Sequence, residues 1–217
     1  MMDVRALQSR LGVAADGMFG PKSRAALIAR FTNTAAPAVN SADLISFASR
    51  LHCSAKQLAA VAKVESAGGG FDDRGRPKML FERHLFHRQT GGRWSPSSFS
   101  QATGGGYSED SWGKLLLACA KDPDAAFSSC SWGKFQVLGL HWSKLGYESP
   151  FALAVSTVES EAAHYDLLSR YIEAFGLADE LRALSSDPED CRAFARRYNG
   201  PAYERFDYHK KLASAMR

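Results

Sequence analysis

The stretch SAKQLAAVAKVESAGGG, from Ser54 to Gly70, combines a helix start, an apolar stripe and a glycine run. Ser54 and Gln57 have the spacing of a capping box, in which each side chain bonds the backbone N–H of the other residue. Apolar residues then recur at helical spacing, and the three glycines end the pattern. We therefore expect a helix from Ser54 to Ser66 that packs one face on a core.

One carboxylate, Glu65, falls on the apolar stripe of this helix, in line with Leu58 and Ala62. A charge at a core-facing position is costly unless it is paired or used, and burial favours the protonated acid. Such an acid can donate a proton near neutral pH. The glycines that follow allow a ligand to approach closely. We interpret Glu65 as a candidate general acid; the alternative is that it pairs with an arginine and closes the helix.

A second carboxylate, Glu82, lies between large apolar residues in the stretch LFERH, residues 80–84. Glycoside hydrolysis uses two carboxyl groups, one that protonates the leaving oxygen and one that manages water or the oxocarbenium-like centre. Glu65 and Glu82 are candidates for these two roles. A structural Glu82 paired with an arginine stays open as an alternative.

Helical periodicity dominates the rest of the chain, so we expect a mainly α fold with a small β element. Residues 32–40, TNTAAPAVN, are small and uncharged and predict a linker between a helical hairpin, residues 1–31, and a domain over residues 41–217. Few contacts should cross this linker. In the hairpin, Pro21 opens the second helix. Beyond the linker we expect a strand or helix entry at Lys78–Arg83 and helices over Ser41–Leu51, Ser111–Ala120, Ala125–Leu138, Ser149–Tyr165 and Asp187–Asn199, with one more at the chain end.

Composition excludes several classes of function. The net charge is only +4, without an arginine-rich tract, and no glycine fingerprint for nucleotides is present, so we expect no nucleic-acid partner. No apolar run is long enough to span a bilayer and the start has no signal-peptide pattern, so we expect cytoplasmic synthesis without stable membrane insertion. No metal-binding spacing occurs, and we expect no metal, no cofactor and free thiols at Cys53, Cys119, Cys130 and Cys191.

Three ordered motifs resemble those of the phage N-acetylmuramidase family of endolysins: VAKVESAG at residues 61–68, KMLFERH at 78–84 and SWGKFQVLG at 131–139. The resemblance covers about Ser41 to Arg217. It also extends, through the terminal YNG element at 198–200, to the wider lysozyme and lytic-transglycosylase superfamily. It implies a lysozyme-like, mainly helical fold in which Glu65 is the catalytic acid and Glu82 the second functional carboxylate. Residues that line the glycan cleft would be Gln136, Tyr147 and Asn199.

The N-terminal hairpin resembles a peptidoglycan-binding module in the motifs VRALQSRLG, residues 4–12, and DGMFGPKS, residues 16–23. It stops after Phe31, at roughly half the usual length of such a module. The alternative is an inert hairpin that packs on the catalytic domain.

Together, these resemblances imply a monomeric peptidoglycan hydrolase that cuts the β-1,4 bond after N-acetylmuramic acid in glycan strands. A phage enzyme of this kind would accumulate in the host cytoplasm and reach the wall through a membrane lesion such as a holin. Two alternatives stay open. A lytic transglycosylase uses the same acid but leaves anhydro-muramic ends, and a non-catalytic wall-binding or virion structural protein would have kept only the fold. Four tryptophans could stack on sugars or fill the core: Trp94, Trp112, Trp132 and Trp142.

Overall fold

A computed structural model of the chain describes all residues except 1, 67, 95–98 and 100–109. The described part is mostly helical with a small antiparallel sheet, which confirms the predicted fold class. The chain forms two compact units. Unit 1 combines Met1–Ala36 with Phe71–Glu159, and unit 2 combines Pro37–Gly70 with Ser160–Arg217. Each unit is therefore assembled from two separate segments of sequence.

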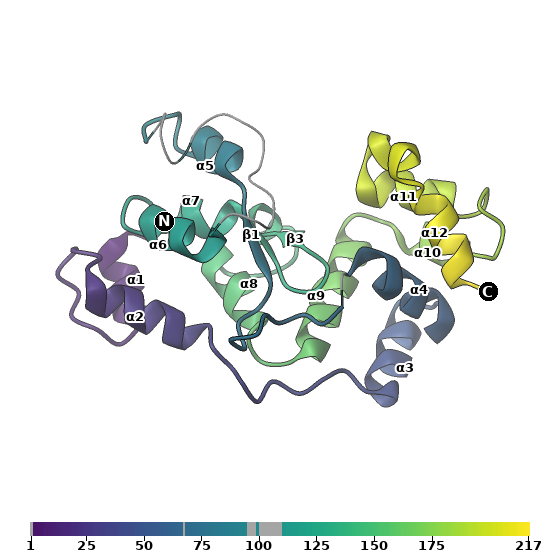
Figure 1. Ribbon diagram of the computed structural model, residues 1–217, viewed down its shortest axis with the longest axis horizontal. Helices are drawn as coiled ribbons and strands as arrows, with labels where there is room; N and C mark the ends of the chain where they lie inside the picture. The colour runs from purple at the N-terminus through teal and green to yellow at the C-terminus, as the bar shows by residue number, and fades with distance from the viewer. Residues whose placement is uncertain (1, 67, 95–98, 100–109) are drawn as a thin grey trace. The chain divides into compact units, whose positions relative to one another are not determined.

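Unit 1 holds the sheet, whose strands β1 (Met79–Phe81), β2 (Cys130–Trp132) and β3 (Val137–Leu138) pair in that order. Leu80 lies opposite Ser131. Seven helices complete the unit (Figure 1): α1 (Val4–Arg10), α2 (Pro21–Arg30), α5 (Arg83–Gln89), α6 (Ser111–Cys119), α7 (Pro123–Ser128), the short 3-10 helix η1 (Gly139–His141) and α8 (Pro150–Ser156). The three strands and seven helices are the elements found among the residues of unit 1 that the structure describes.

The helix predicted over Ala125–Leu138 is wrong. The chain there forms the end of α7 and then turns through β2 and β3. All three residues of β2 are buried, so the strand shows no alternation of apolar and polar side chains. A short buried strand of this kind cannot be told from a helix segment by periodicity. The helix predicted over Ser149–Tyr165 also ends early, at Ser156, and Ser160 caps a separate helix.

The core of unit 1 is centred on Trp132, whose side chain is fully buried. The Trp132 indole Nε1–H donates a hydrogen bond to the Phe127 carbonyl oxygen at 3.1 Å. Gly139 lies against the same carbonyl, because a Cβ added there would come within 2.2 Å of that oxygen. The motif at residues 131–139 is thus packed directly on the end of α7.

The N-terminal hairpin forms as predicted, with Pro21 in the first turn of α2, but it is packed into unit 1. Phe31 is fully buried and its ring stacks on Trp132 and Phe127 at centroid distances of 5.4 Å and 5.9 Å. The Met2 backbone N–H donates to Asp124 Oδ2 at 2.6 Å. These contacts run against the expectation that few would connect the hairpin to the rest of the chain.

Unit 2 is helical throughout its described residues: α3 (Ser41–Arg50), α4 (Ala55–Glu65), α9 (Glu161–Ala174), α10 (Ala178–Arg182), α11 (Arg192–Asn199), the 3-10 helix η2 (Pro201–Phe206) and α12 (Tyr208–Ala215). α4 packs against α3 and α12 (Figure 1). The predicted capping box of α4 is confirmed, with Gln57 N donating to Ser54 Oγ at 3.1 Å and Ser54 N to Gln57 Oε1 at 2.9 Å.

α3 begins at Ser41 as predicted, and Asn40 caps it, because the Asn40 side chain accepts from the Asp43 backbone N–H while the Asp43 side chain accepts from the Asn40 backbone N–H. One helix start differs from the prediction. α11 begins at Arg192 rather than near Asp187. The four cysteines are free thiols, as predicted. No helix in the described part of the chain is long and apolar enough to cross a bilayer.

Candidate active site

Glu65 is the last residue of α4, and its half-buried side chain contacts the end of α11. Glu65 Oε2 accepts a hydrogen bond from Asn199 Nδ2 at 2.8 Å. Asn199 ends α11 because Gly200 follows with a φ of 81°, a backbone conformation that favours glycine. Glu65 Oε1 is buried and has no hydrogen-bond partner among the described residues. Two sequence-predicted site residues, 134 positions apart, are therefore in direct contact.

Burial raises the pKa of the Glu65 carboxyl from its ordinary value of 4.5 to about 7. The Asn199 hydrogen bond and the positive charge of Lys211 act in the opposite direction but are weaker. Tyr198 adds to the apolar surroundings, since its ring is stacked on Phe194 at a centroid distance of 5.4 Å. Burial and the nearby Glu65 charge also raise the pKa of Tyr198 well above its ordinary value. Glu65 is thus partly protonated at neutral pH.

The hydrogen bond also decides where the proton of Glu65 belongs. An amide nitrogen can only donate, so Oε2 acts as the acceptor in its bond with Asn199. The carboxyl proton is then carried by Oε1, the oxygen without a partner in the described structure. A protonated oxygen with no competing acceptor is suited to donate to a substrate oxygen.

Glu82 lies in unit 1, directly after β1 and at the start of α5. Its backbone N–H donates to the Ser129 carbonyl oxygen at 2.8 Å, which fixes its main chain beside the sheet. The side chain is half-buried, and its Oε2 lies 3.6 Å from His84 Nδ1. Burial raises the pKa of the Glu82 carboxyl, and the His84 charge opposes this rise.

Gln136 and Tyr147 also belong to unit 1. Gln136 lies just before β3 with a φ of 50°, which is uncommon for a residue other than glycine and is a form of strain often found at functional sites. Its Nε2 donates to the Gly133 carbonyl oxygen at 2.8 Å, while Oε1 is buried and has no partner in the described residues. The Tyr147 hydroxyl accepts from Ser156 Oγ at 3.3 Å.

The sequence pattern of the N-acetylmuramidase family matches residues 54–217. The chain belongs to the N-acetylmuramidase family. Among solved structures it is similar to the crystal structure of Burkholderia AP3 phage endolysin, with 33% sequence identity and a TM-score of 0.74. That similarity covers 98% of this chain and 82% of the other. No curated protein matches the chain.

These comparisons confirm the resemblance on which the site residues were predicted, and they make the chain a peptidoglycan-degrading glycoside hydrolase by family. The N-acetylmuramidase match includes Glu65, Glu82, Gln136, Tyr147 and Asn199, since all five lie within residues 54–217. It begins after the hairpin, so the peptidoglycan-binding role of residues 1–31 stays a prediction.

Several features of this N-acetylmuramidase were missed from sequence. Lys211 influences Glu65 although it belongs to the final helix, α12, and the only available signal was a basic pair at residues 210–211. Trp112 and Trp132 fill the core of unit 1, which excludes them as sugar platforms. The residues that the structure describes contain no group of three or more side chains able to hold a metal ion.

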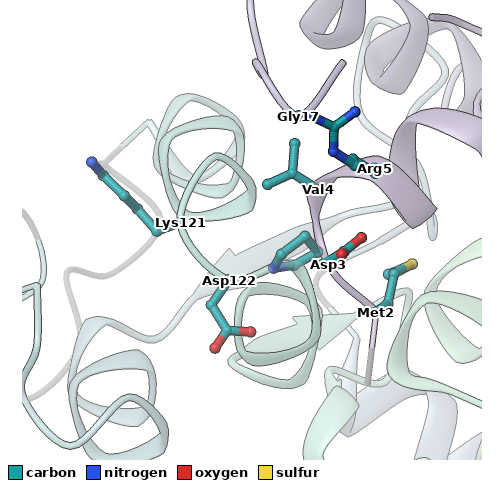
Figure 2. Close-up of a pocket in the computed structure, with 8 residues that line it drawn as sticks. Met2, Asp3, Val4, Arg5, Gly17, Lys121 and Asp122 are labelled. Carbon is teal, nitrogen blue, oxygen red and sulfur yellow. The ribbon is translucent and has the colours of Figure 1, made fainter. Parts of the chain in front are cut away.

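A cavity of about 410 Å³ lies elsewhere in unit 1 and contains none of the predicted site residues. Figure 2 shows it between the start of the N-terminal hairpin and the turn that precedes α7. Its lining residues are Met2, Asp3, Val4, Arg5, Gly17, Lys121, Asp122 and Pro123.

Proposed function

We propose that the chain is an endolysin that hydrolyses the β-1,4 bond between N-acetylmuramic acid and N-acetylglucosamine, with Glu65 as general acid. The observation that carries this proposal is the state of the Glu65 carboxyl. Its pKa of about 7 keeps part of the population protonated at neutral pH, and Asn199 leaves Oε1 as the proton donor. Family membership and the similarity to a phage endolysin support the choice of substrate.

In this mechanism Oε1 of Glu65 donates its proton to the glycosidic oxygen as the bond to C1 of the muramic acid breaks. The leaving sugar departs as an alcohol, and positive charge develops on the ring of the muramic acid. A water molecule then adds to C1 and gives up a proton, so that the product is a reducing end. Glu65, which is now ionised and held by Asn199, is restored when it regains a proton.

Glu82 is proposed as the second functional carboxylate, which removes the proton from the attacking water or stabilises the developing positive charge. Either role requires ionised Glu82, and the neighbouring His84 favours that form. Gln136, Tyr147 and Asn199 are proposed to line the glycan cleft. Asn199 would act chiefly by orienting Glu65, because its Nδ2 is already bonded to that carboxylate.

The first experiment compares the native chain with Glu65→Gln on purified peptidoglycan. General acid catalysis typically contributes about 10²–10⁴-fold, so the release of reducing ends should fall by at least a hundredfold. Glu159→Gln, an exposed change, is the matched control and should keep full activity. Both variants should give the native circular dichroism spectrum. A loss below tenfold for Glu65→Gln would show that another group donates the proton.

The second experiment is mass spectrometry of the fragments. Hydrolysis gives reducing N-acetylmuramic acid ends that have gained a water molecule. A lytic transglycosylase also protonates the bond with one acid, but the C6 hydroxyl of the sugar attacks C1 and the ends are anhydro-muramic. Predominantly anhydro ends would therefore show that the chain is a transglycosylase and not a hydrolase. Ends on N-acetylglucosamine would reverse the bond assignment, and no cleavage at all would favour a wall-binding protein.

A further inference from the structure

Trp142 differs from the other tryptophans because its indole has no partner in the described part of unit 1. Trp112 and Trp132 contact other aromatic rings in the core. Lys121 Nζ lies over the Trp94 ring at 5.0 Å from its centroid. No ring or cation among the described residues is stacked on Trp142, and its Nε1–H has no hydrogen-bond partner there. Because the side chain is only partly buried, a flat ring and one donor are accessible to a ligand.

Two adjacent cavities of unit 1 lie beside this indole. Their volumes are about 270 Å³ and 200 Å³, and Trp142 and Asp124 line both of them. Met2 and Asp122 connect them to the cavity of about 410 Å³ shown in Figure 2, since Met2 lines that cavity and the first, and Asp122 lines it and the second. The two cavities beside Trp142 are here called the hairpin groove.

The hairpin groove is built by two parts of unit 1. The N-terminal hairpin contributes Met2, Ala6 and Arg10, and the rest of the unit contributes Asp124 and Glu148 together with Trp142. An ion pair between Arg10 Nη1 and Glu148 Oε1, at 3.2 Å, joins the two parts. The hydrogen bond from the Met2 N–H to Asp124 Oδ2 joins them a second time. The groove therefore forms only where the hairpin is packed on the rest of unit 1.

Acidic groups predominate in the hairpin groove. Its described lining residues include three carboxylates, Asp122, Asp124 and Glu148, and one base, Arg10, which is paired with Glu148. Asp122 Oδ2 and Asp124 Oδ1 have no hydrogen-bond partner among the described residues. Acceptor oxygens beside a flat ring match a sugar, whose hydroxyls donate and whose C–H face is apolar. A ligand that carries carboxylates would be repelled.

We propose that the hairpin groove is a second binding site for the uncharged glycan backbone of peptidoglycan, with Trp142 stacked on a pyranose ring and Asp124 accepting from its hydroxyls. This inference rests on the proposed function, because it takes the same polymer as ligand. The groove is lined by none of the residues proposed to act in cleavage.

The chemistry of the polymer decides which of its parts fits the hairpin groove. In peptidoglycan an amide bond joins the lactyl group of N-acetylmuramic acid to the stem peptide, so the glycan backbone is uncharged and the free carboxylates belong to the peptides. The acidic groove therefore favours the backbone over the peptides. The N-terminal hairpin takes part as one wall of a composite site, and binding also requires Trp142, which lies outside the hairpin.

The test measures retention of the Glu65→Gln protein on purified cell-wall sacculi, without cleavage. In that background, Trp142→Ala removes the ring, and Leu140→Ala is its control, because Leu140 is 44% exposed on the neighbouring η1 and lines neither cavity. Ala6→Leu fills the groove from α1, where leucine is well accepted in a helix. Ala25→Leu, at an exposed position of α2 outside the groove, is the control for that change.

Trp142→Ala and Ala6→Leu should each bind sacculi about tenfold more weakly than the parent, because an aromatic contact and a second attachment point are lost. Leu140→Ala and Ala25→Leu should bind as the parent does. Trp142→Phe keeps a flat ring and should keep most of the binding. In the chain with native Glu65, Trp142→Ala should raise KM for sacculi and leave kcat on short soluble glycan fragments unchanged. Thermal unfolding shows whether each variant is folded, and Ala6→Leu tests the groove with Trp142 intact.

The inference is wrong if Ala6→Leu binds sacculi as tightly as Ala25→Leu does. It is also wrong if the folded Trp142→Ala protein is retained like the parent. Release of the parent, but not of Trp142→Ala, by isolated stem peptides would identify the peptide as the occupant and overturn the assignment to the glycan. The proposed function fails by a different measurement, the absence of new reducing ends when the native chain is incubated with peptidoglycan. The two failures are distinguishable, since binding in the Glu65→Gln background does not depend on cleavage.

Discussion

Replacing Glu65 with glutamine should stabilise the protein at neutral and alkaline pH while it removes activity. The native carboxyl is held where its ionised form is poorly solvated, which is why burial raises its pKa to about 7. Ionisation of Glu65 in the folded state is therefore costly. Glutamine has the same shape, cannot ionise and can still accept the Asn199 hydrogen bond through its own amide oxygen.

The size and sign of this effect follow from the difference between folded and unfolded states. An unfolded chain loses the Glu65 proton at its ordinary pKa of 4.5, whereas the folded protein retains it up to about 7. Between these pH values the folded state binds one more proton, so the free energy of unfolding falls as pH rises, by about 1.4 kcal/mol per pH unit. The total loss is about 3 kcal/mol above pH 7. Below pH 4.5 this contribution to stability is fully present.

The assay is thermal unfolding of the native chain and Glu65→Gln from pH 4 to pH 8.5, roughly the range over which the difference develops. The melting temperatures should coincide at the acid end and diverge until Glu65→Gln melts roughly 6–12 °C higher at the alkaline end. Glu159→Gln, an exposed substitution, should show no comparable divergence. A Glu65→Gln protein that is equally or less stable at pH 8 would refute the costly burial of this carboxylate and with it the argument for a proton donor.

Lys211→Gln removes a positive charge that lowers the pKa of Glu65, so the alkaline limb of the pH–activity profile should move to higher pH. An unchanged limb would show that the charge of Lys211 does not act on the group that donates the proton. Glu82→Gln should reduce turnover by about a hundredfold or more if Glu82 manages water or charge, and unchanged turnover would make it structural and favour the single-acid transglycosylase. Phe31→Ala should cost about 3–5 kcal/mol in the free energy of unfolding measured with urea, because the ring is fully buried among four other aromatic rings. Met18→Ala, at an exposed position of the same hairpin, should change it by less than about 0.5 kcal/mol, and equal effects of the two substitutions would contradict the burial of Phe31.

Local sequence signals predicted those elements that are determined locally. The Ser54–Gln57 capping box, Pro21 at the start of α2 and the glycine run after Glu65 are such cases, because each depends on residues within a few positions. The helix predicted over Ala125–Leu138 failed because β2 pairs with β1, where Phe81 lies opposite Cys130, and a local pattern does not contain so distant a partner. The linker at residues 32–40 was recognised by composition, yet the burial of Phe31 depends on rings from α6, α7, β2 and α8.

The candidate site divides in the same way. The position of Glu65 on an apolar stripe was visible in the sequence, and its buried carboxyl with a raised pKa agrees with that interpretation. The hydrogen bond between Glu65 and Asn199 was not visible in the sequence, since the family resemblance named Asn199 only as a cleft residue. The influence of Lys211 on Glu65 also required the structure. It depends on how α12 packs against α4, and that packing brings together residues that no spacing rule connects.

The discontinuity of unit 2 has a consequence for synthesis on the ribosome. Glu65 emerges early, but Asn199 is 134 residues further along, and α12 lies beyond it. At the usual rate of roughly 5–20 residues per second, the acid waits on the order of ten seconds before the helices that bury it exist. During that interval Glu65 is an ordinary, ionised surface carboxylate. Nascent chains and fragments that end before α11 would therefore lack the environment that raises the pKa of Glu65, which forms only after α11 and α12 have been synthesised.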